Sequence, residues 1–370
     1  MRFYNESHKY TCGIDLHKNN LHMCVQDETG KALVHRRLPN SGQEFLRVLE
    51  PYREDVVVSV ESTFNWYWLG DVCMAAKIPF ILGHAQYMKA IHQGKTKNDR
   101  VDSAKIAKLT AAKMFPQSYV YPKEMRKIRD LLRRRMYFVR ERAALKGHVN
   151  IVGAQYNVDL SAEAGSKVLR GKALIECFND LDIQESVDCD YKTAGFLDSI
   201  VRRIEKYVLK RVKRDNEAGF ELLCTIPGIG HVLGLTILYE MHNVERFPRC
   251  QNFMSYARLV SCVPTSNDKK VGKPHRKIGN PYLKWAFSEA AMHMSRVNPE
   301  VHAYVEQLKK RYGAAGAWSR LSQKIGRTVY YMLKNNTPFS IERFMKNSKE
   351  ALESKVTSLE PCKEAAMVID

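Results

Sequence analysis

The sequence predicts an α/β domain at residues 1–120, a basic helical connector at residues 121–218 and a mostly helical C-terminal domain at residues 219–340. Over the first part, short runs rich in β-branched residues alternate with amphipathic segments, as in a sheet covered by helices. From Lys123, apolar residues recur at steps of three and four, the spacing of long amphipathic helices. After Glu221, apolar segments surround a turn with two glycines, and residues 341–370 have the composition of a loose tail.

Each element of the first domain follows from its own pattern. The runs typical of strands are Tyr10–Leu16, Leu21–Gln26, Ala32–Leu38, Val56–Val60 and Phe80–Leu82. The segments that predict helices are Gln43–Leu49, Trp66–Ala76 and Asp102–Lys113. Three strands in a meander, followed by strands that alternate with helices, is the order of a ribonuclease-H-like domain.

Two long basic helices, similar to a coiled coil, are predicted for the connector. The first has an apolar stripe of Met125, Ile128, Leu132, Met136, Val139 and Ala143, and the second one of Phe196, Ile200, Ile204, Val208 and Val212. Residues 123–150 contain ten basic residues and three acids, and Arg133, Arg134 and Arg135 are candidate phosphate contacts. The pattern leaves two interpretations open: a solvated hairpin that spaces two domains, or a surface that binds nucleic acid.

The C-terminal domain begins with the turn Pro227-Gly228-Ile229-Gly230 between two apolar segments. This pattern is typical of a helix-hairpin-helix, whose turn presents backbone N–H groups that hold a phosphate without reading sequence. The alternative is a turn that only packs two helices together. Further helices are predicted at Pro281–Arg296, Val301–Arg311 and Trp318–Lys334.

Charge and cysteine content narrow the classes of function. Lys and Arg total 59 against 40 acids, a formal charge of +19, which favours a polyanionic partner and leaves DNA, RNA and anionic membranes open. The 18 uncharged residues Leu222–Tyr239 approach the length of a membrane span, but the Pro-Gly-Ile-Gly turn at their centre argues against one. The polar start of the chain predicts no signal peptide. Nine cysteines without a C-x-x-C pair predict reduced thiols in a cytoplasm.

Four acidic residues occupy positions where a carboxylate is unusual. Alternation along the first strand places Asp15 on the same face as His17, opposite the apolar residues. A carboxylate within a strand is costly to bury unless it is paired or binds a cation. Glu61 ends a buried strand, at the edge where α/β sheets hold ligands. Asp99 and Asp102 are three residues apart, so a helix that begins there places both on one face.

Together these acids predict a site for Mg²⁺, which takes oxygen ligands and retains waters for a substrate phosphate. Two such ions could clamp the attacking and leaving oxygens of a phosphoryl transfer. Each acid also has a purely structural interpretation. Asp99 or Asp102 could cap a helix and Glu61 could begin a loop, whereas Asp15 is the hardest to explain by structure alone.

Three motifs around these acids resemble the N-terminal motifs of the DEDD insertion-sequence transposases. They are Gly13-Ile14-Asp15-Leu16-His17-Lys18, Val60-Glu61-Ser62-Thr63 and Lys95-Thr96-Lys97-Asn98-Asp99-Arg100-Val101-Asp102. These transposases form insertion-sequence family one-ten, the bridge-RNA-guided recombinases, to which the Piv-type DNA invertases are related. The resemblance implies a RuvC-like site in which Asp15, Glu61, Asp99 and Asp102 are catalytic metal ligands.

The same family has a C-terminal domain that supplies a nucleophilic serine, and the resemblance continues over residues 225–334. Its motifs here are Pro227-Gly228-Ile229-Gly230, Arg246-Phe247, Phe253–Val260 and Gly279-Asn280-Pro281-Tyr282-Leu283. The family's Ser-Asn-Gly-Lys-Lys segment reads Thr265-Ser266-Asn267-Asp268-Lys269-Lys270, which assigns the nucleophile to Ser266. Asp268 replaces the usual glycine, and Ser261 is the competing serine. Positive charge for a phosphate follows directly, from Lys269, Lys270, Lys273, His275, Arg276 and Lys277.

The resemblance also implies partners. It implies a structured guide RNA that pairs with donor and target DNA, so that base pairing carries the specificity. It further implies a phosphoserine bond that conserves phosphodiester energy, and a dimer or tetramer whose catalytic domains meet across protomers. Two alternatives remain open. A metal-only endonuclease such as a junction resolvase needs the acids but not Ser266, and a non-catalytic nucleic-acid-binding protein tolerates the loss of any acid.

Overall fold

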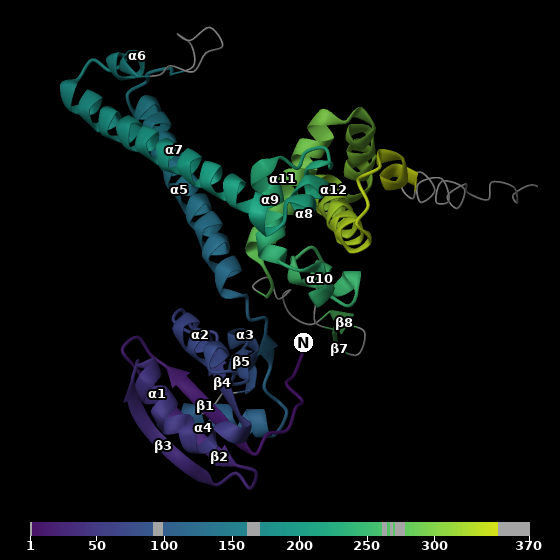
Figure 1. Ribbon diagram of the computed structural model, residues 1–370. Coiled ribbons are helices and arrows are strands. Elements are labelled where there is room, and N and C mark those ends of the chain that lie inside the picture. The colour runs from purple at the N-terminus through teal and green to yellow at the C-terminus, as the bar shows by residue number, and fades with distance from the viewer. Residues whose placement is uncertain are drawn as a thin grey trace, which may run out of the picture. The chain divides into compact units, whose positions relative to one another are not determined.

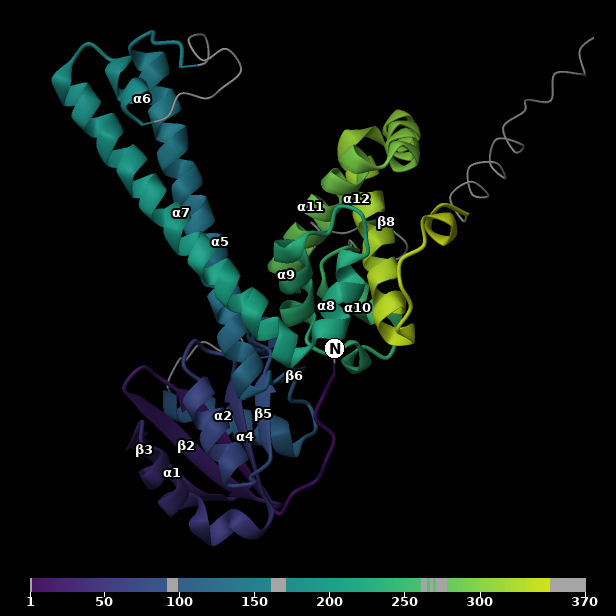
Figure 2. The same ribbon diagram turned by 45° about the horizontal axis from the view of Figure 1, so that its top comes forward.

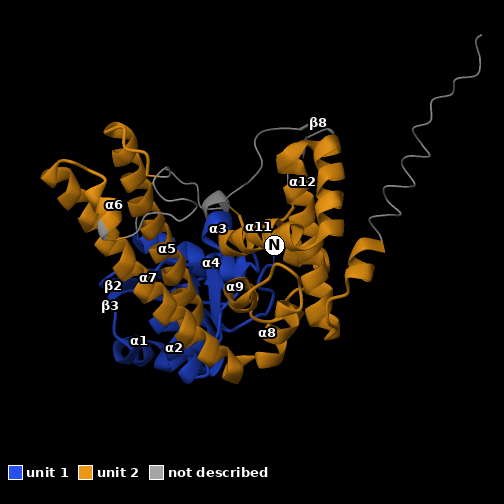
Figure 3. Ribbon diagram, turned by 90° about the horizontal axis from the view of Figure 1, so that it is seen from above, with its two compact units in different colours: residues 1–126 blue, residues 127–370 orange. Residues whose placement is uncertain are grey.

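The computed structural model describes residues 2–91, 99–160, 171–260, 265–266, 269–270 and 278–346. The chain divides into two compact units, Met1–Arg126 and Lys127–Asp370 (Figure 3). The first unit is a mixed α/β sheet domain, and the second is mostly helical. The predicted order of an α/β part followed by helices is therefore confirmed, and the architecture is compatible with a RuvC-like fold.

A six-stranded sheet in the order β3-β2-β1-β4-β5-β6 forms the centre of the first unit (Figure 1). Its strands are β1 (Tyr10–Leu16), β2 (Asn20–Asp27), β3 (Ala32–Pro39), β4 (Val56–Glu61), β5 (Phe80–Gly83) and β6 (Gln117–Ser118). The first three form an antiparallel meander; β4 then pairs in parallel with β1, and β5 with β4. The five predicted strands are confirmed, with ends displaced by no more than one residue, and the short edge strand β6 was not predicted.

Helices cover both faces of this sheet. On one face, α1 (Gly42–Leu49) and α2 (Tyr67–Ala75) pack onto apolar residues of β1, β2 and β4. On the other, α3 (Ala85–Ile91) and α4 (Asp99–Ala111) contribute to a second, smaller cluster. Val57 belongs to the second cluster and Val58 to the first, and both are fully buried. Strand β4 is thus covered on both sides, as its continuous apolar run predicts.

Two long antiparallel helices, α5 (Lys123–Gln155) and α7 (Leu181–Asp215), run side by side, with the short α6 (Lys172–Glu176) near their far turn (Figures 1 and 2). Ion pairs join Arg135 with Glu205 and Arg142 with Asp198, and farther along α5 a hydrogen bond joins Nδ1 of His148 to Asp190. From one contact to the next, the residue number rises along α5 and falls along α7. These pairs therefore set the antiparallel register of the hairpin.

The buried stripe of α7 agrees with the predicted one at Ile204, Val208 and Val212 and differs from it nearer the start of the helix. Phe196 is 66% exposed, and the buried positions are Val187, Ala194, Val201, Ile204, Val208 and Val212. Four-residue steps overshoot one helical turn by about 40°, so a stripe made only of such steps winds away from the partner helix. The steps of seven over Val187, Ala194 and Val201 keep the first part of the stripe facing α5, and four-residue steps occur only over the last two turns, to Val208 and Val212. On α5, Ile128, Leu132 and Met136 are buried as predicted, whereas Ala143 is exposed.

The rest of the second unit is a compact helical body, called the C-terminal body below. Its helices are α8 (Glu217–Cys224), α9 (His231–Met241), the 3-10 turn η3 (Val244–Arg246), α10 (Cys250–Tyr256), α11 (Pro281–Val297) and α12 (Pro299–Asn335). The two last predicted helices are the halves of α12, which Gly313 interrupts with a non-helical φ of 71° and ψ of 168°. Within the described ranges, none of the helices combines the length and apolar character that a membrane crossing requires.

The turn between α8 and α9 allows close helix packing. Gly228 has a φ of +89°, and a Cβ there would lie 2.4 Å from the Met294 backbone nitrogen and 2.9 Å from the Ala290 carbonyl oxygen. Only glycine satisfies both the backbone conformation and this contact with α11. The predicted turn between two helices is therefore present, and close packing against α11 explains why residue 228 is a glycine. Phosphate binding by this turn stays a prediction.

Candidate active site

Two of the predicted acids end neighbouring parallel strands. Asp15 lies next to the end of β1, and Glu61 is the last residue of β4. The register pairs Ile14 with Val60, so that Asp15 and Glu61 occupy the next positions along the two strands. Both residues therefore stand at the carboxyl-terminal edge that β1 and β4 share, where open α/β sheets hold their ligands.

The other two acids, Asp99 and Asp102, occupy the first turn of α4. This helix crosses β1 at Gly13, where a Cβ would lie 2.2 Å from the carbonyl oxygen of Ser103. A side chain at this position would hold the helix away from the strand. Because alternation places Gly13 and Asp15 on the same face of β1, the start of α4 lies near Asp15.

Two polar contacts fix α4 on the sheet. Near its start, Nε2 of His35 donates a hydrogen bond to the Arg100 carbonyl at 2.8 Å. Farther along, the buried hydroxyl of Thr110 donates to the hydroxyl of Ser59 in β4, also at 2.8 Å. The helix is thus tied to β3 at one end and to β4 at the other, which fixes the position of its acidic first turn.

His17, to which the sequence analysis assigned no role, lies between the acids. Its Nε2 is 3.3 Å from Oδ2 of Asp15 and 3.1 Å from Oδ2 of Asp99, and the ligand atoms of all three residues lie within 4.8 Å of one another. The side-chain amides of Asn40 and Asn65 donate hydrogen bonds to the His17 carbonyl at 2.9 and 2.6 Å. The signal for His17 was present in the alternation of β1, which places it on the face of Asp15.

The charges around Asp15 oppose its ionisation. Burial raises the pKa of Asp15, His17 and His22 oppose this shift, and the charges of Asp99 and Asp102 raise the pKa further. Asp102 has a local counter-charge, the Lys105 ammonium at 3.5 Å. A set of like charges in a half-buried place is unfavourable on its own, and a bound cation reverses that balance.

The side chains in this group fit a divalent cation. His17 Nε2 is buried and makes no hydrogen bond, although two carboxylate oxygens face it. When the imidazole is neutral, the nitrogen and both oxygens are electron-pair donors, so that a cation among them satisfies all three. Asp15, His17 and Asp99 would hold the ion, with Asp102 and Glu61 adjacent. Within the described ranges, this is the one group of three or more such side chains compact enough to share an ion.

The predicted nucleophile lies in the second unit. Ser266 belongs to β7 (Thr265–Ser266), which pairs antiparallel with β8 (Lys269–Lys270), and Ser266 stands opposite Lys269. The backbone of Ser266 is therefore paired with that of Lys269 in this two-stranded sheet. The competing serine and several of the predicted cations lie outside the described residues, namely Ser261, Lys273, His275, Arg276 and Lys277.

Comparisons with known proteins match both parts of this arrangement. A family model for DEDD transposases of the IS110 type, described as "Transposase", matches residues 12–152, which contain all four acids. A second, described as "Transposase IS116/IS110/IS902 family", matches residues 220–306, which contain Ser266. The chain belongs to the IS110 family of transposases.

Two curated relatives extend this similarity along most of the transposase. The "Transposase for insertion sequence element IS1111A" of Coxiella burnetii (strain RSA 493 / Nine Mile phase I) is 23% identical over 333 residues, 87% of this chain and 88% of the relative. The "Transposase for insertion sequence element IS1328" of Yersinia enterocolitica is 22% identical over 338 residues, 89% of this chain and 98% of the relative. The resemblance seen in the motifs is confirmed, and the protein is a DNA transposase.

The Gly-Asn motif of the transposase joins three helices. Asn280 caps α11 by accepting a hydrogen bond from the Tyr282 N–H, and its Nδ2 donates to Glu240 of α9 at 2.7 Å. Arg133 of α5 donates to the same carboxylate, through Nε at 2.6 Å and Nη2 at 2.8 Å. Burial alone would lower the pKa of Arg133, but its hydrogen bonds to Glu240 and the charge of that carboxylate raise it overall. Glu240 is 1% exposed, so this ion pair is part of the core.

The structure corrects the expected phosphate contacts on the connector. Arg133 is engaged with Glu240, and Arg135 lies 2.6 Å from Glu205 of α7, which leaves Arg134 as the exposed member of the three. Arg133 and Arg135 therefore hold the unit together. A clearer set of exposed cations lies on α7, one helical turn apart, at Lys206, Lys210 and Lys213. None of these lysines takes part in a salt bridge with another described residue.

Proposed function

We propose that this transposase cleaves and rejoins DNA under RNA guidance, using a Mg²⁺ site of Asp15, Glu61, Asp99 and Asp102 and a phosphoserine intermediate at Ser266. The observation that carries the proposal is the meeting of the β1 and β4 ends with the first turn of α4 at one sheet edge. The same meeting, together with the strand order, supports a RuvC-like assignment of the first unit.

The acids are proposed to bind the ion together with Nε2 of His17, and the surrounding residues to position these ligands. When bound, Mg²⁺ neutralises charge on a phosphodiester and polarises the attacking oxygen. His17 faces the oxygens of Asp15 and Asp99, and the amides of Asn40 and Asn65 hold the His17 backbone. These contacts support a site that keeps its acids in place before the ion and the substrate arrive, which limits the reorganisation that binding requires.

Ser266 is proposed to attack the phosphorus of a DNA phosphodiester. Its hydroxyl loses a proton, a bond forms between Oγ and phosphorus, and the bond from phosphorus to one deoxyribose oxygen breaks. That oxygen takes up a proton and becomes a free hydroxyl. When a deoxyribose hydroxyl later attacks the phosphoserine, the same steps run in reverse, so that strands rejoin without an outside source of energy. Serine is a weak nucleophile, and the adjacent Lys269 and Lys270 supply charge that stabilises the phosphate.

Family membership supports three further parts of the proposal. A structured guide RNA pairs with donor and target DNA, a homodimer or homotetramer completes each reaction centre, and the protein acts in the bacterial cytoplasm at the nucleoid. The formal charge of +19 suits two polyanionic partners, because each neutralised phosphate releases counterions.

A covalent adduct tests the nucleophile directly. Labelled target DNA with a nick that prevents rejoining is incubated with the protein, Mg²⁺ and RNA transcribed from the non-coding flank of the element. The label should migrate with denatured protein and map to the peptide Thr265–Lys269. Ser266→Ala should abolish the adduct, and Ser261→Ala, the matched control, should retain it. Omission of the RNA should abolish cleavage at the specific site.

Other outcomes favour other functions. The acid group lies entirely within the first unit, which supports a metal-only endonuclease as the second candidate. Free DNA ends without an adduct, together with an active Ser266→Ala variant, would establish that candidate, because water would then be the nucleophile. An adduct on Ser261 would reassign the residue but keep the mechanism, and site-specific cleavage without RNA would remove the guide.

A further inference from the structure

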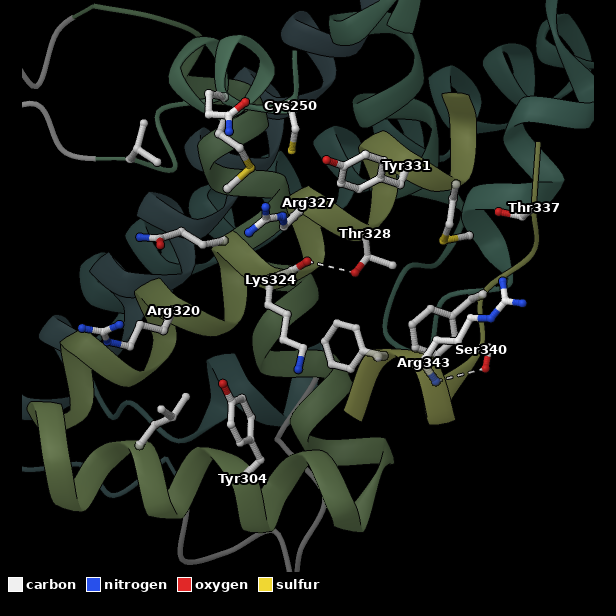
Figure 4. A pocket seen from close by; sticks show the side chains of 18 of the residues that line it. Cys250, Tyr304, Arg320, Lys324, Arg327, Thr328, Tyr331, Thr337, Ser340 and Arg343 are labelled. Carbon is white, nitrogen blue, oxygen red and sulfur yellow. Dashed lines mark hydrogen bonds between the residues drawn. The ribbon is translucent and has the colours of Figure 1, made fainter. Parts of the chain in front are cut away.

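A large cavity lies in the C-terminal body, bounded by α10, both halves of α12 and the segment that follows α12 (Figure 4). Its volume is about 1090 Å³. Much of its lining comes from residues 307–344, beyond the end of the second family match at residue 306. The cavity contains neither the acids nor Ser266, so the proposed reaction does not account for it.

The break in α12 builds this cavity from two helical faces. The first half of the helix contributes Tyr304, Leu308 and Arg311, and the second half Arg320, Lys324, Arg327 and Tyr331. Steps of three and four residues place each set on one face of its half-helix. Because Gly313 interrupts the helix between the two sets, both faces line the same hollow.

The cavity wall is cationic. Five basic residues line it, namely Arg311, Arg320, Lys324, Arg327 and Arg343, and no Asp or Glu is among the described lining residues. The four arginines form no ion pair with any carboxylate in the described part of the chain. Like charges around one hollow repel each other, and an anionic ligand relieves that repulsion.

Aromatic rings contact two of these cations. The Lys324 ammonium lies 5.1 Å from the ring centre of Tyr304 and 4.6 Å from that of Phe344, and Figure 4 shows the side chain extending toward Tyr304. The Arg320 guanidinium lies 3.6 Å from the ring centre of Tyr312. A ring face orients a cation but leaves its net charge uncompensated. Burial lowers the pKa of Lys324 to about 8.

Tyr331 indicates what kind of anion fits. It is 45% exposed and lies one helical turn beyond Arg327 on the cavity face of α12. Its ring meets that of Tyr330 edge-on, with an interplanar angle of 82°. An exposed ring beside cations is the arrangement that stacks an unpaired base while the cations bind the phosphates. Within a duplex, neighbouring bases cover both faces of each base. A single strand therefore fits the cavity better, because its bases are free to stack on Tyr331.

We propose that the cavity binds a single-stranded segment of nucleic acid, with phosphates on Arg320, Arg327 and Arg343 and an unpaired base against Tyr331. The site is independent of the metal centre, of Ser266 and of the guide RNA proposed above. Single-stranded DNA and RNA share the chemistry that the cavity recognises, and the binding experiment distinguishes them.

The test uses the full-length protein and measures the fluorescence anisotropy of labelled oligo-dT and oligo-U of about 12 nucleotides. Arg320→Gln/Arg327→Gln should weaken binding about tenfold, and should reduce the slope of log K against log salt by about 1.4, at about 0.7 per contact. The matched control, Arg296→Gln/Lys310→Gln, removes the same charge from exposed positions of α11 and α12 outside the cavity. It should change affinity by less than about twofold and leave the slope unchanged.

Tyr331 provides a second, independent readout. Tyr331→Ala should weaken binding by about 5- to 150-fold without changing the salt slope, and Tyr331→Phe should retain affinity. A photoreactive thio-substituted oligonucleotide should crosslink to the tryptic peptide Thr328–Lys334. Thermal unfolding of each variant verifies that it is folded.

Several results would overturn the proposal. They are equal losses in the cavity and control variants, equal losses for a blunt duplex and a single strand, competition by poly-glutamate as effective as that by an oligonucleotide, and a crosslink that avoids Thr328–Lys334. A cavity-dependent preference for oligo-U or for oligo-dT supports the proposal and identifies the natural strand as RNA or DNA.

Discussion

In residues 1–126, carboxylates gather at one edge of a sheet, whereas in the second unit the core carboxylate of Glu240 meets an arginine and an asparagine. The second unit also gathers charges of one sign, but these are cations around a cavity. In a buried pair of opposite charges, each charge compensates the other, and the pair stabilises the fold. In a group of like charges no member compensates another, so the group indicates where a ligand of opposite charge binds.

The largest effect is expected where like charges meet in the first unit. Asp15→Asn or Asp102→Asn should reduce Mg²⁺-dependent strand exchange by about 1000-fold or more, because the ion contributes several kcal/mol. Glu28→Gln, which removes an exposed acid from the same unit, should have no effect. Burial raises the pKa of Asp15, so its ionised form lowers stability at neutral pH, and metal-free Asp15→Asn should melt no lower than wild type. Undiminished exchange by either aspartate variant would exclude the metal assignment.

Mutation of the Arg133–Glu240 pair should change the stability of the protein rather than its ligand binding. Arg133→Ala leaves Glu240 buried without its arginine and should lower the free energy of unfolding by about 3 kcal/mol. The neighbouring Arg134 is exposed, so Arg134→Ala should change the free energy of unfolding by less than about 0.5 kcal/mol. Urea titrations measure both values. Adding Glu240→Gln to Arg133→Ala should recover part of the loss. Equal values for the two single variants would show that the Glu240 pair is not a core interaction.

Replacement of the exposed lysines of α7 tests whether cations without an ion pair bind phosphate on the hairpin, as proposed for those in the cavity. Replacing Lys206, Lys210 and Lys213 by Gln should lower the salt slope of duplex DNA binding by about 2.7, at about 0.9 per contact. Lys192, on the same helix, is paired with Asp188, and Lys192→Gln should leave the slope unchanged. Salt curves that overlay for the triple variant and wild type would make the hairpin a spacer.

The smallest effect concerns the stability cost of the cationic cavity. Lys324 has a pKa of about 8 in the folded protein against an ordinary value of 10.5, so the unfolded chain binds the proton more tightly. The cost is therefore fully present below pH 8 and disappears as the pH rises toward 10.5. Lys324→Met should raise the melting temperature at pH 7 by about 2 °C or more, by a margin that shrinks at pH 9.5. Exposed Lys310→Met is the control, and a margin independent of pH would show that the Lys324 charge is not the cause.

Local patterns predicted most of the first unit. The strands were identified because alternation and β-branched runs are properties of neighbouring residues. Asp15 and Glu61 stood out because carboxylates are rare in such runs, and Asp99 and Asp102 because their spacing places both on one face of a helix. Asp15 and Asp99 lie together as the motifs implied, with His17 between them. The roles of these acids, and of Ser266, remain predictions that the experiments above address.

Features that depend on distant partners could not be predicted in the same way. Arg133 is indistinguishable in sequence from the exposed Arg134, because Glu240, its partner, lies 107 residues away. The first part of the α7 stripe was misplaced at Phe196, because the buried face of a helix in a pair is set by the surface of the partner helix. The cavity was overlooked because the Arg320, Lys324 and Arg327 spacing also fits an ordinary solvated face.

The carboxylate shared by Arg133 and Asn280 gives the second unit a mechanical property. A hinge between the long hairpin and the C-terminal body would have to separate Arg133 from the buried carboxylate of Glu240, at a cost of about 3–5 kcal/mol. This cost opposes bending between the hairpin and the body. If strands bind at Lys206–Lys213 and in the cavity, as proposed above, the same cost would keep the distance between them constant while the DNA is rearranged.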